Sequence, residues 1–190
     1  MRVYVEALRA WQRRINLVSA RTLQRVWVRH VADALQLLEL LPARTARIVD
    51  LGSGGGVPGL ALALALEAGG PEVLLVESNA KKCAFLRHVV HKAGARATIL
   101  QRRIETLDPV AIGCDGQTVL TARAVAPLPT LLGLTEPLFA AGAQALWHKG
   151  RGWRAEVEAA QAAWRLQWRS HRSVTEREAV ILQITDARHV

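Results

Sequence analysis

Residues 48–59 form a short apolar run that ends in an acid and opens into a glycine-rich turn, with the sequence IVDLGSGGGVPG. Such a run is typical of a buried parallel strand, and the Ala- and Leu-rich stretch that follows predicts a helix. The glycines let the backbone turn tightly and approach a ligand, while the start of the helix offers free N–H groups. The segment therefore predicts a strand–loop–helix unit that binds a nucleotide-containing cofactor.

Glu77 supports this interpretation, because it ends a second apolar run and follows Gly56 by 21 residues. An acid at the tip of the second strand can accept hydrogen bonds from both ribose hydroxyls of a cofactor. Gly54, Gly56 and Gly59 also match the dinucleotide pattern literally. However, Pro58 stands where a pyrophosphate-binding helix would offer an N–H donor. S-adenosylmethionine fits better, since it has no pyrophosphate and its ammonium suits a carboxylate such as Asp50 near the strand tip. A dinucleotide, or a glycine turn that binds nothing, remain the alternatives.

Downstream of the loop, strand-like runs alternate with helical segments. The predicted strands are 47–51, 72–77, 97–100, 117–122 and 143–148, and the clearest helices are 80–92 and 151–163. This alternation predicts a doubly wound, Rossmann-like α/β domain over residues 46–190. Two further runs, 166–174 and 177–185, predict an antiparallel hairpin at the sheet edge.

Two amphipathic helices are predicted before the loop. Their apolar positions are Tyr4, Leu8, Trp11 and Ile15 in the first helix, and Leu23, Val26, Trp27, Val31, Ala34, Leu35 and Leu38 in the second. Residues 1–47 hold nine arginines and three acids, which is +6 of the net charge of +9. Such an excess is either a solvated face or a surface for a polyanion. Beside a methyl-donor site it favours RNA, so residues 1–45 are predicted to be a short, basic helical extension that binds RNA.

Composition narrows the class of protein further. With 190 residues and 51% hydrophobic content, the chain is long enough for one well-packed domain. No apolar run is long enough to span a membrane, and the start of the chain does not resemble a signal segment, which predicts a cytoplasmic protein without a membrane partner. Two cysteines are too few for a disulfide framework, and no spacing predicts a metal site.

Ligands of such a sheet bind at the carboxyl ends of its strands, so the residues there are candidates for chemistry. These are Asp50, Glu77, the segment 102–105, Arg123 and Lys149. Arg123 stands between two apolar stretches, where an unpaired guanidinium would be costly. We therefore expect all five strand ends to meet at one pocket.

The motifs resemble those of a known family, the glucose-inhibited division protein B family, whose members are called 16S rRNA (guanine(527)-N(7))-methyltransferases. The resemblance covers nearly the whole chain. It rests on Trp11 with the Asn16-Leu17-x-Ser19 motif, Arg29-His30-x-x-Asp33, the loop from Asp50 to Gly59, Glu77-Ser78 with Lys81-Lys82 and Phe85-Leu86, Arg103-x-Glu105, Ala122-Arg123-Ala124 and Lys149-Gly150. Two departures stand out: Ala34 replaces the family's usual serine, and relatives usually have a further helical segment before Trp11. We therefore expect either a short member of the family or a trimmed chain.

The resemblance implies a class I S-adenosylmethionine-dependent methyltransferase that releases S-adenosyl-L-homocysteine and acts on 16S rRNA of the small ribosomal subunit as a monomer. The cofactor residues expected from the resemblance and the loop together are Asp50, Gly52, Gly54, Gly56, Val57, Glu77, Ile104, Glu105 and Arg123. The candidate RNA contacts are Arg13, Arg14, Asn16, Arg29 and Lys149. The alternatives are an RNA-binding assembly module without turnover and a dinucleotide-dependent oxidoreductase.

Guanine N7 carries a free lone pair, so its methylation requires no general base. The candidates Arg123, His30 and Asp33 are therefore expected to act by positioning. For two of these residues, a purely structural role is the alternative. His30, beside an apolar stripe, is often only a packing residue. Asp33 follows Arg29 by four residues, which predicts an ordinary helical ion pair between them.

Overall fold

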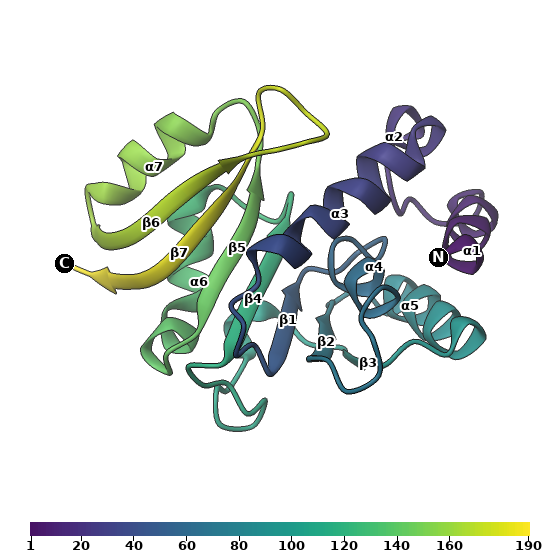
Figure 1. Cartoon of the computed structure of the whole chain (residues 1–190), viewed down its shortest axis with the longest axis horizontal. Coiled ribbons are helices and arrows are strands. Elements are labelled where there is room, and N and C mark those ends of the chain that lie inside the picture. The colour runs from purple at the N-terminus through teal and green to yellow at the C-terminus, as the bar shows by residue number, and fades with distance from the viewer.

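The structure is a computed structural model that describes the backbone of residues 1–190 and all side chains except those of Ala20 and Arg21. Its centre is a seven-stranded sheet in the order β3-β2-β1-β4-β5-β7-β6 (Figure 1). The strands are β1 (Arg47–Leu51), β2 (Glu72–Val76), β3 (Ala97–Leu100), β4 (Thr118–Arg123), β5 (Gln144–Lys149), β6 (Trp164–Arg172) and β7 (Val180–His189). This order confirms the doubly wound α/β fold of a class I methyltransferase.

Strands β1 to β5 pair in parallel, whereas β7 pairs antiparallel with β5 and with β6. The predicted edge hairpin is therefore confirmed. The predicted strand boundaries agree with the observed ones to within a few residues. The parallel strands also place their carboxyl ends along one edge of the sheet, where the sequence predicts the site.

Helices cover both faces of the sheet (Figure 1). They are α1 (Arg2–Gln12), α2 (Ala20–Gln24), α3 (Asp33–Leu35), α4 (Gly59–Ala63), α5 (Ala80–Ala93), α6 (Leu128–Ala140) and α7 (Trp153–Gln161), with the 3₁₀ turns η2 (Gln36–Leu40) and η3 (Ile104–Thr106) and the π-helical segment η1 (Trp27–Ala32). No helix among the described residues is long and apolar enough to cross a membrane.

The strands supply residues alternately to two apolar cores. In β1, Ile48 packs with helices α1 and α5, while Val49 and Leu51 pack on the other side with α6 and α7. This alternation follows from the two-residue period of a strand. As predicted for the first helix, Tyr4 and Leu8 are fully buried, whereas Ile15 lies beyond the end of α1.

The second predicted helix is not one regular helix. It divides into α2, η1, α3 and η2. The helix breaks at Arg25, whose φ of −113° and ψ of 33° are not helical, and a π-helical segment with more residues per turn begins at Trp27, so the side chains before and after the break do not form one stripe. Trp27, predicted to be on the buried face, is 46% exposed, and Leu37, outside the predicted stripe, is fully buried. The prediction was therefore wrong at Trp27.

Candidate functional site

The loop between β1 and α4 has a conformation that depends on glycine. Gly52, Gly54 and Gly56 have φ values of +66°, +49° and +88°, which side chains disfavour. A Cβ atom at Gly52 would also lie 2.9 Å from a methyl group of Val125. The loop therefore keeps its backbone close to the cavity above it, as its sequence predicts.

Asp50 lies beneath this loop. It is fully buried, and its Oδ1 accepts a hydrogen bond of 2.8 Å from the Thr121 hydroxyl. A Cβ atom on Gly59 would lie only 2.4 Å from the Cβ of Asp50, so the start of α4 packs directly on this side chain. Burial raises the pKa of Asp50 to about 6. This arrangement supports the loop but does not bring the carboxylate into the cavity, as the expected ammonium contact would require.

Glu77 has the geometry of a ribose-binding acid. Its Oε2 accepts a hydrogen bond from the Gly54 N–H at 2.9 Å, and its Oε1 accepts one from the Asn79 N–H at 2.8 Å. Each carboxylate oxygen can accept a further bond. Glu77 is thus fixed against the glycine loop while retaining acceptor capacity for two hydroxyl groups. These residues fit the S-adenosylmethionine that the sequence predicts.

The N-terminal segment also builds the cofactor site. The Tyr4 hydroxyl donates a hydrogen bond to the Gly55 carbonyl at 2.8 Å, and a Cβ atom on Gly55 would lie 3.0 Å from Val18. Gln12 fixes the intervening turn, because its Oε1 accepts from the Leu17 and Val18 N–H groups and its Nε2 donates to the Val18 carbonyl. Sequence reasoning placed Tyr4 only in the apolar stripe and missed Gln12. The one signal was the Asn16-Leu17-x-Ser19 motif.

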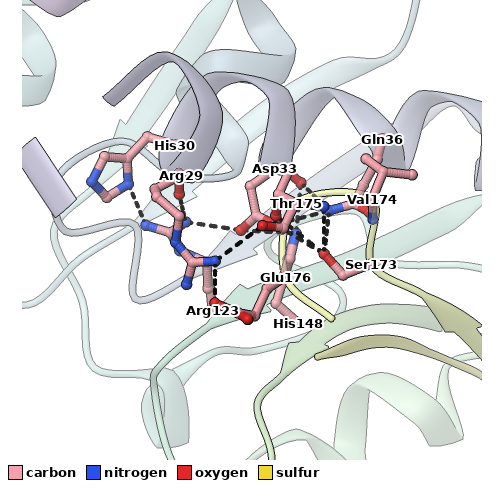
Figure 2. Close-up of polar contacts among 10 residues, drawn as sticks. All are labelled: Arg29, His30, Asp33, Gln36, Arg123, His148, Ser173, Val174, Thr175 and Glu176. Carbon is pink, nitrogen blue, oxygen red and sulfur yellow. Dashed lines mark hydrogen bonds and ion pairs between the residues drawn. The ribbon is translucent and has the colours of Figure 1, made fainter. Parts of the chain in front are cut away.

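Arg123, at the end of β4, is held by residues of the segment 29–33 (Figure 2). Its Nη1 donates to Asp33 Oδ2 at 3.0 Å and to the Arg29 carbonyl at 2.6 Å, and its Nη2 donates to His30 Nδ1. Because a guanidinium only donates, His30 Nδ1 must accept and the neutral ring carries its proton on Nε2. Burial, followed by the charge of Arg123, lowers the pKa of His30 to about 4. His30 is therefore neutral at physiological pH.

Asp33 is the centre of the polar network in Figure 2. Its Oδ2 accepts from Arg123, and its Oδ1 accepts from Gln36 Nε2 at 2.9 Å and from Thr175 Oγ1 at 2.5 Å. The Asp33 carbonyl faces His148 Nε2 at 2.8 Å. Burial alone would raise the pKa of Asp33, but His148, the Thr175 hydroxyl and Arg123 outweigh it, so the pKa lies below its usual value.

The predicted helical ion pair between Arg29 and Asp33 is wrong. Arg29 Nη1 instead contacts Glu176 Oε2 at 2.8 Å, in the turn between β6 and β7. These residues lie in and directly after the π-helical segment η1, where side chains four apart do not lie above one another as in an α-helix. Ala34, in place of the family's serine, is fully buried and packs on Val57 and Ala61.

The other predicted residues are distributed around this centre. Lys149 is 7% exposed, and its Nζ donates to the Ala126 carbonyl at 2.9 Å and to Glu156 Oε2 at 2.8 Å. Ile104 and Glu105 lie in η3, just after β3. Arg13, Arg14 and Asn16 are exposed in the turn after α1. Among the described residues, no three His, Cys, Asp or Glu side chains are grouped so as to hold a metal ion.

A cavity of about 530 Å³ joins the two halves of the site. That volume is typical of a small-molecule site. The glycine loop and residues 17–19 line one end, whereas Arg123, His148 and Lys149 line the other. Of the five strand ends expected to meet there, only Arg123 and Lys149 contribute their own side chains to the lining. Asp50 lies beneath the loop, and Glu77 and the segment 102–105 lie outside the lining.

Solved methyltransferases share this fold. The chain superposes on a magnesium protoporphyrin IX methyltransferase from Synechocystis with bound S-adenosylhomocysteine, with a TM-score of 0.58, 13% identity and 95% and 94% of the two chains covered. A putative O-methyltransferase from Klebsiella pneumoniae gives a TM-score of 0.60, with 17% identity and coverage of 97% and 90%. The fold and the site define a class I S-adenosylmethionine-dependent methyltransferase.

Residues 1–185 match the model of the GidB family, described as rRNA small subunit methyltransferase G, and the chain belongs to this family. A ribosomal RNA small subunit methyltransferase G from Methylobacterium radiotolerans is 48% identical over 185 residues, covering 96% of this chain and 85% of the relative. The corresponding protein of a Chelativorans species is 44% identical over 187 residues, with coverage of 96% and 85%. The protein is therefore an S-adenosylmethionine-dependent rRNA methyltransferase, and the two alternatives without this activity are excluded.

Proposed function

We propose that the protein transfers the sulfonium methyl group of S-adenosylmethionine to N7 of a guanine, at position 527 by the family's name, in 16S rRNA. One observation carries this proposal: each group near Arg123 that resembles a general base is either engaged or closed off. His148, which lines the cavity, donates through Nε2 to the Asp33 carbonyl, and its Nδ1 is buried. His30 Nδ1 accepts from Arg123, and Asp33 accepts from Arg123, Gln36 and Thr175. N7 is a nucleophile that needs no deprotonation, which matches a site without a free base.

The cofactor supplies an electrophilic methyl group on a sulfonium. We assign its ribose hydroxyls to Glu77 and its remaining contacts to Gly52, Gly54, Gly56, Val57, Ile104, Glu105 and Arg123. A bond forms between N7 and the methyl carbon while the carbon–sulfur bond breaks, leaving a cationic methylguanine and S-adenosylhomocysteine. No proton leaves either reactant.

Positioning is the task of Arg123, with His30 and Asp33 acting through it. The three hydrogen bonds of its guanidinium fix its direction at the cavity wall. A bond from Arg123 to N7 itself would occupy the attacking lone pair, so we assign it to the cofactor, to guanine O6 or to a phosphate. Holding sulfur, carbon and nitrogen in line is the main source of rate in such a transfer.

On the RNA side, we propose that residues 1–45 form a basic extension on a methyltransferase domain of residues 46–190, acting as a cytoplasmic monomer. Its candidate contacts are Arg13, Arg14, Asn16 and Arg29, together with Lys149. The exposure of the first three and the position of the last two at the cavity support this assignment. N7 lies in the deep, narrow major groove of A-form RNA, so the target guanine must be splayed out of its helix.

The test is the pH dependence of methyl transfer in a single turnover at saturating RNA and cofactor. A nucleophile that must lose a proton gives a rate that rises tenfold per pH unit below the pKa of its base. We expect a nearly flat rate between about pH 6 and 9, and measurable turnover in both His30→Ala and Asp33→Asn. The product is mapped as N7-methylguanine in 16S rRNA. A unit-slope limb that one of these substitutions abolishes would identify a general base and overturn the mechanism.

A further inference from the structure

A second cavity of about 470 Å³ adjoins the first one. The two share Thr22, Arg29, Gly150 and Glu176 in their linings, so they form one continuous depression. The second cavity adds Arg25, Arg151 and Glu178. In Figure 1, the turn between β6 and β7 reaches across the upper edge of the sheet toward α2 and α3. The depression therefore extends from the glycine loop, past Arg123, toward this turn.

Three arginines line this second cavity, and two of them are paired with acids of the turn. Arg29 Nη1 contacts Glu176 Oε2 at 2.8 Å, and Arg151 contacts Glu178 Oε2 through Nε at 2.8 Å and Nη2 at 2.7 Å. Arg25, at the end of α2, is exposed and makes no ion pair with the described side chains. The Arg151 side chain is 82% exposed and that of Glu178 is 52% exposed. Ion pairs this open to solvent contribute little to stability, so another anion can replace the carboxylate.

The position of the cavity matches what a splayed-out nucleotide requires. Of the proposed cofactor residues, Gly52, Gly54 and Val57 line the depression at the glycine loop, which leaves space beside Arg123 for the base. When a base leaves its stack and enters a pocket, its flanking phosphates stay at the mouth of that pocket. Here the mouth is lined by guanidinium groups, which bind phosphate oxygens in a bidentate manner.

We propose that Arg25, Arg29 and Arg151 bind the phosphates flanking the target guanosine, and that Glu176 and Glu178 hold Arg29 and Arg151 until RNA replaces them. This inference rests on the proposed function, because it assumes that an RNA base enters the cavity beside Arg123. It adds to the proposed contacts of the N-terminal extension a second RNA contact around the turn between β6 and β7. The exposed Arg13 and Arg14 lie elsewhere, after α1.

The test compares two double variants with the same loss of charge. Arg25→Gln with Arg151→Gln removes two proposed phosphate contacts while leaving Arg29 and its neighbours intact. Arg96→Gln with Arg165→Gln is the control, since both residues are exposed and lie just before β3 and at the start of β6, at the opposite edge of the sheet from the cavity. Binding of a 16S rRNA fragment that contains the target guanine is measured over a range of salt concentrations, together with S-adenosylmethionine affinity, thermal stability and single-turnover methylation.

We expect the Arg25/Arg151 variant to bind RNA at least about tenfold more weakly, with a salt slope about 1.4 smaller, at about 0.7 for each lost contact to single-stranded RNA. Its S-adenosylmethionine affinity and melting temperature should equal those of the wild type. A third variant, Glu178→Gln, should bind RNA several-fold more tightly, because Arg151 is then released in advance.

The outcomes separate this inference from the proposed function. If the Arg25/Arg151 variant and the control lose the same affinity while the wild type methylates the fragment, the RNA binds elsewhere and the inference is overturned. Weaker RNA binding by Glu178→Gln would refute the exchange of carboxylate for phosphate. If the wild type binds the fragment but transfers no methyl group, the proposed function fails, and the affinities still decide where the RNA lies.

Discussion

The two ends of the cavity are built in different ways. The glycine-loop end is local in sequence: Gly54 and Glu77, which are joined by a hydrogen bond, are 23 residues apart, and the loop follows β1 directly. At the Arg123 end, Asp33 is bonded to Arg123 over 90 residues and to Thr175 over 142 residues. The first end is shaped mainly by backbone conformation, and the second by side chains from several distant elements.

This difference separates two kinds of function. A backbone loop with obligatory glycines can hold a cofactor that many methyltransferases share, because its N–H groups are present in every sequence that adopts the turn. The Arg123 end depends on the identity of each side chain, since one missing partner leaves a buried polar group unpaired. We therefore expect substitutions at the Arg123 end to lower both stability and rate, and substitutions at the glycine-loop end to weaken cofactor binding.

The largest effect is expected for Arg123→Ala. It leaves Asp33 largely buried without its guanidinium and removes a positioning group from the cavity, so the free energy of unfolding should fall by about 3 kcal/mol and the single-turnover rate by about a hundredfold or more. Chemical denaturation and rapid-quench methylation measure the two losses separately. Arg123→Lys is the matched control, and it should recover little, because an ammonium cannot reproduce the planar set of three bonds. A normal rate in a folded Arg123→Ala protein would remove Arg123 from the mechanism.

At the other end, Glu77→Ala should weaken S-adenosylmethionine binding by about 1.5 to 3 kcal/mol, the range for hydrogen bonds to a charged group. Calorimetry with the free cofactor measures this loss, and the RNA affinity should hardly change. Glu72→Gln serves as the control, since Glu72 begins the strand that Glu77 directly follows but is exposed and paired with Arg47. Equal affinities in the two variants would mean that Glu77 only supports the loop and does not bind ribose.

The sequence predicted the local parts of this molecule well. The loop, Glu77, the parallel strands and the edge hairpin all follow from spacing and periodicity over short segments. Arg123 was recognisable because an arginine between two apolar runs needs a partner. Its partners were not, because β4 and the segment 29–33 meet only in the folded chain.

The errors have physical causes as well. Trp27 is exposed because the helix breaks at Arg25, whose φ of −113° and ψ of 33° are not helical, so the stripe does not continue across that residue, and a sequence gives no direct sign of such a break. Asp50 lies fully buried beneath the loop, with the start of α4 packed on it, and its contact with the ammonium of the cofactor stays a prediction. The contact of Tyr4 with the glycine loop depends on how α1 packs, which no motif in the chain encodes, and the Asn16-Leu17-x-Ser19 motif was the only sign of the turn that Gln12 fixes.

The smallest predicted effect is the pH dependence of stability, to which a buried group at each end of the cavity contributes with opposite sign. Burial and Arg123 lower the pKa of His30 to about 4. As the pH falls below about 6.5, His30 takes up a proton in the unfolded chain but not in the folded chain, so the free energy of unfolding decreases. Asp50 behaves oppositely, because burial raises its pKa to about 6 and its folded form takes up a proton before its unfolded form does.

Between pH 7.5 and 5 we expect His30 to lower the free energy of unfolding by about 1 to 2 kcal/mol and Asp50 to raise it by about 1 kcal/mol. Urea titrations should therefore show a shallow loss for the wild type on acidification, a smaller loss for His30→Gln and a steeper loss for Asp50→Asn. Parallel profiles for all three proteins would mean that neither buried group governs the acid response.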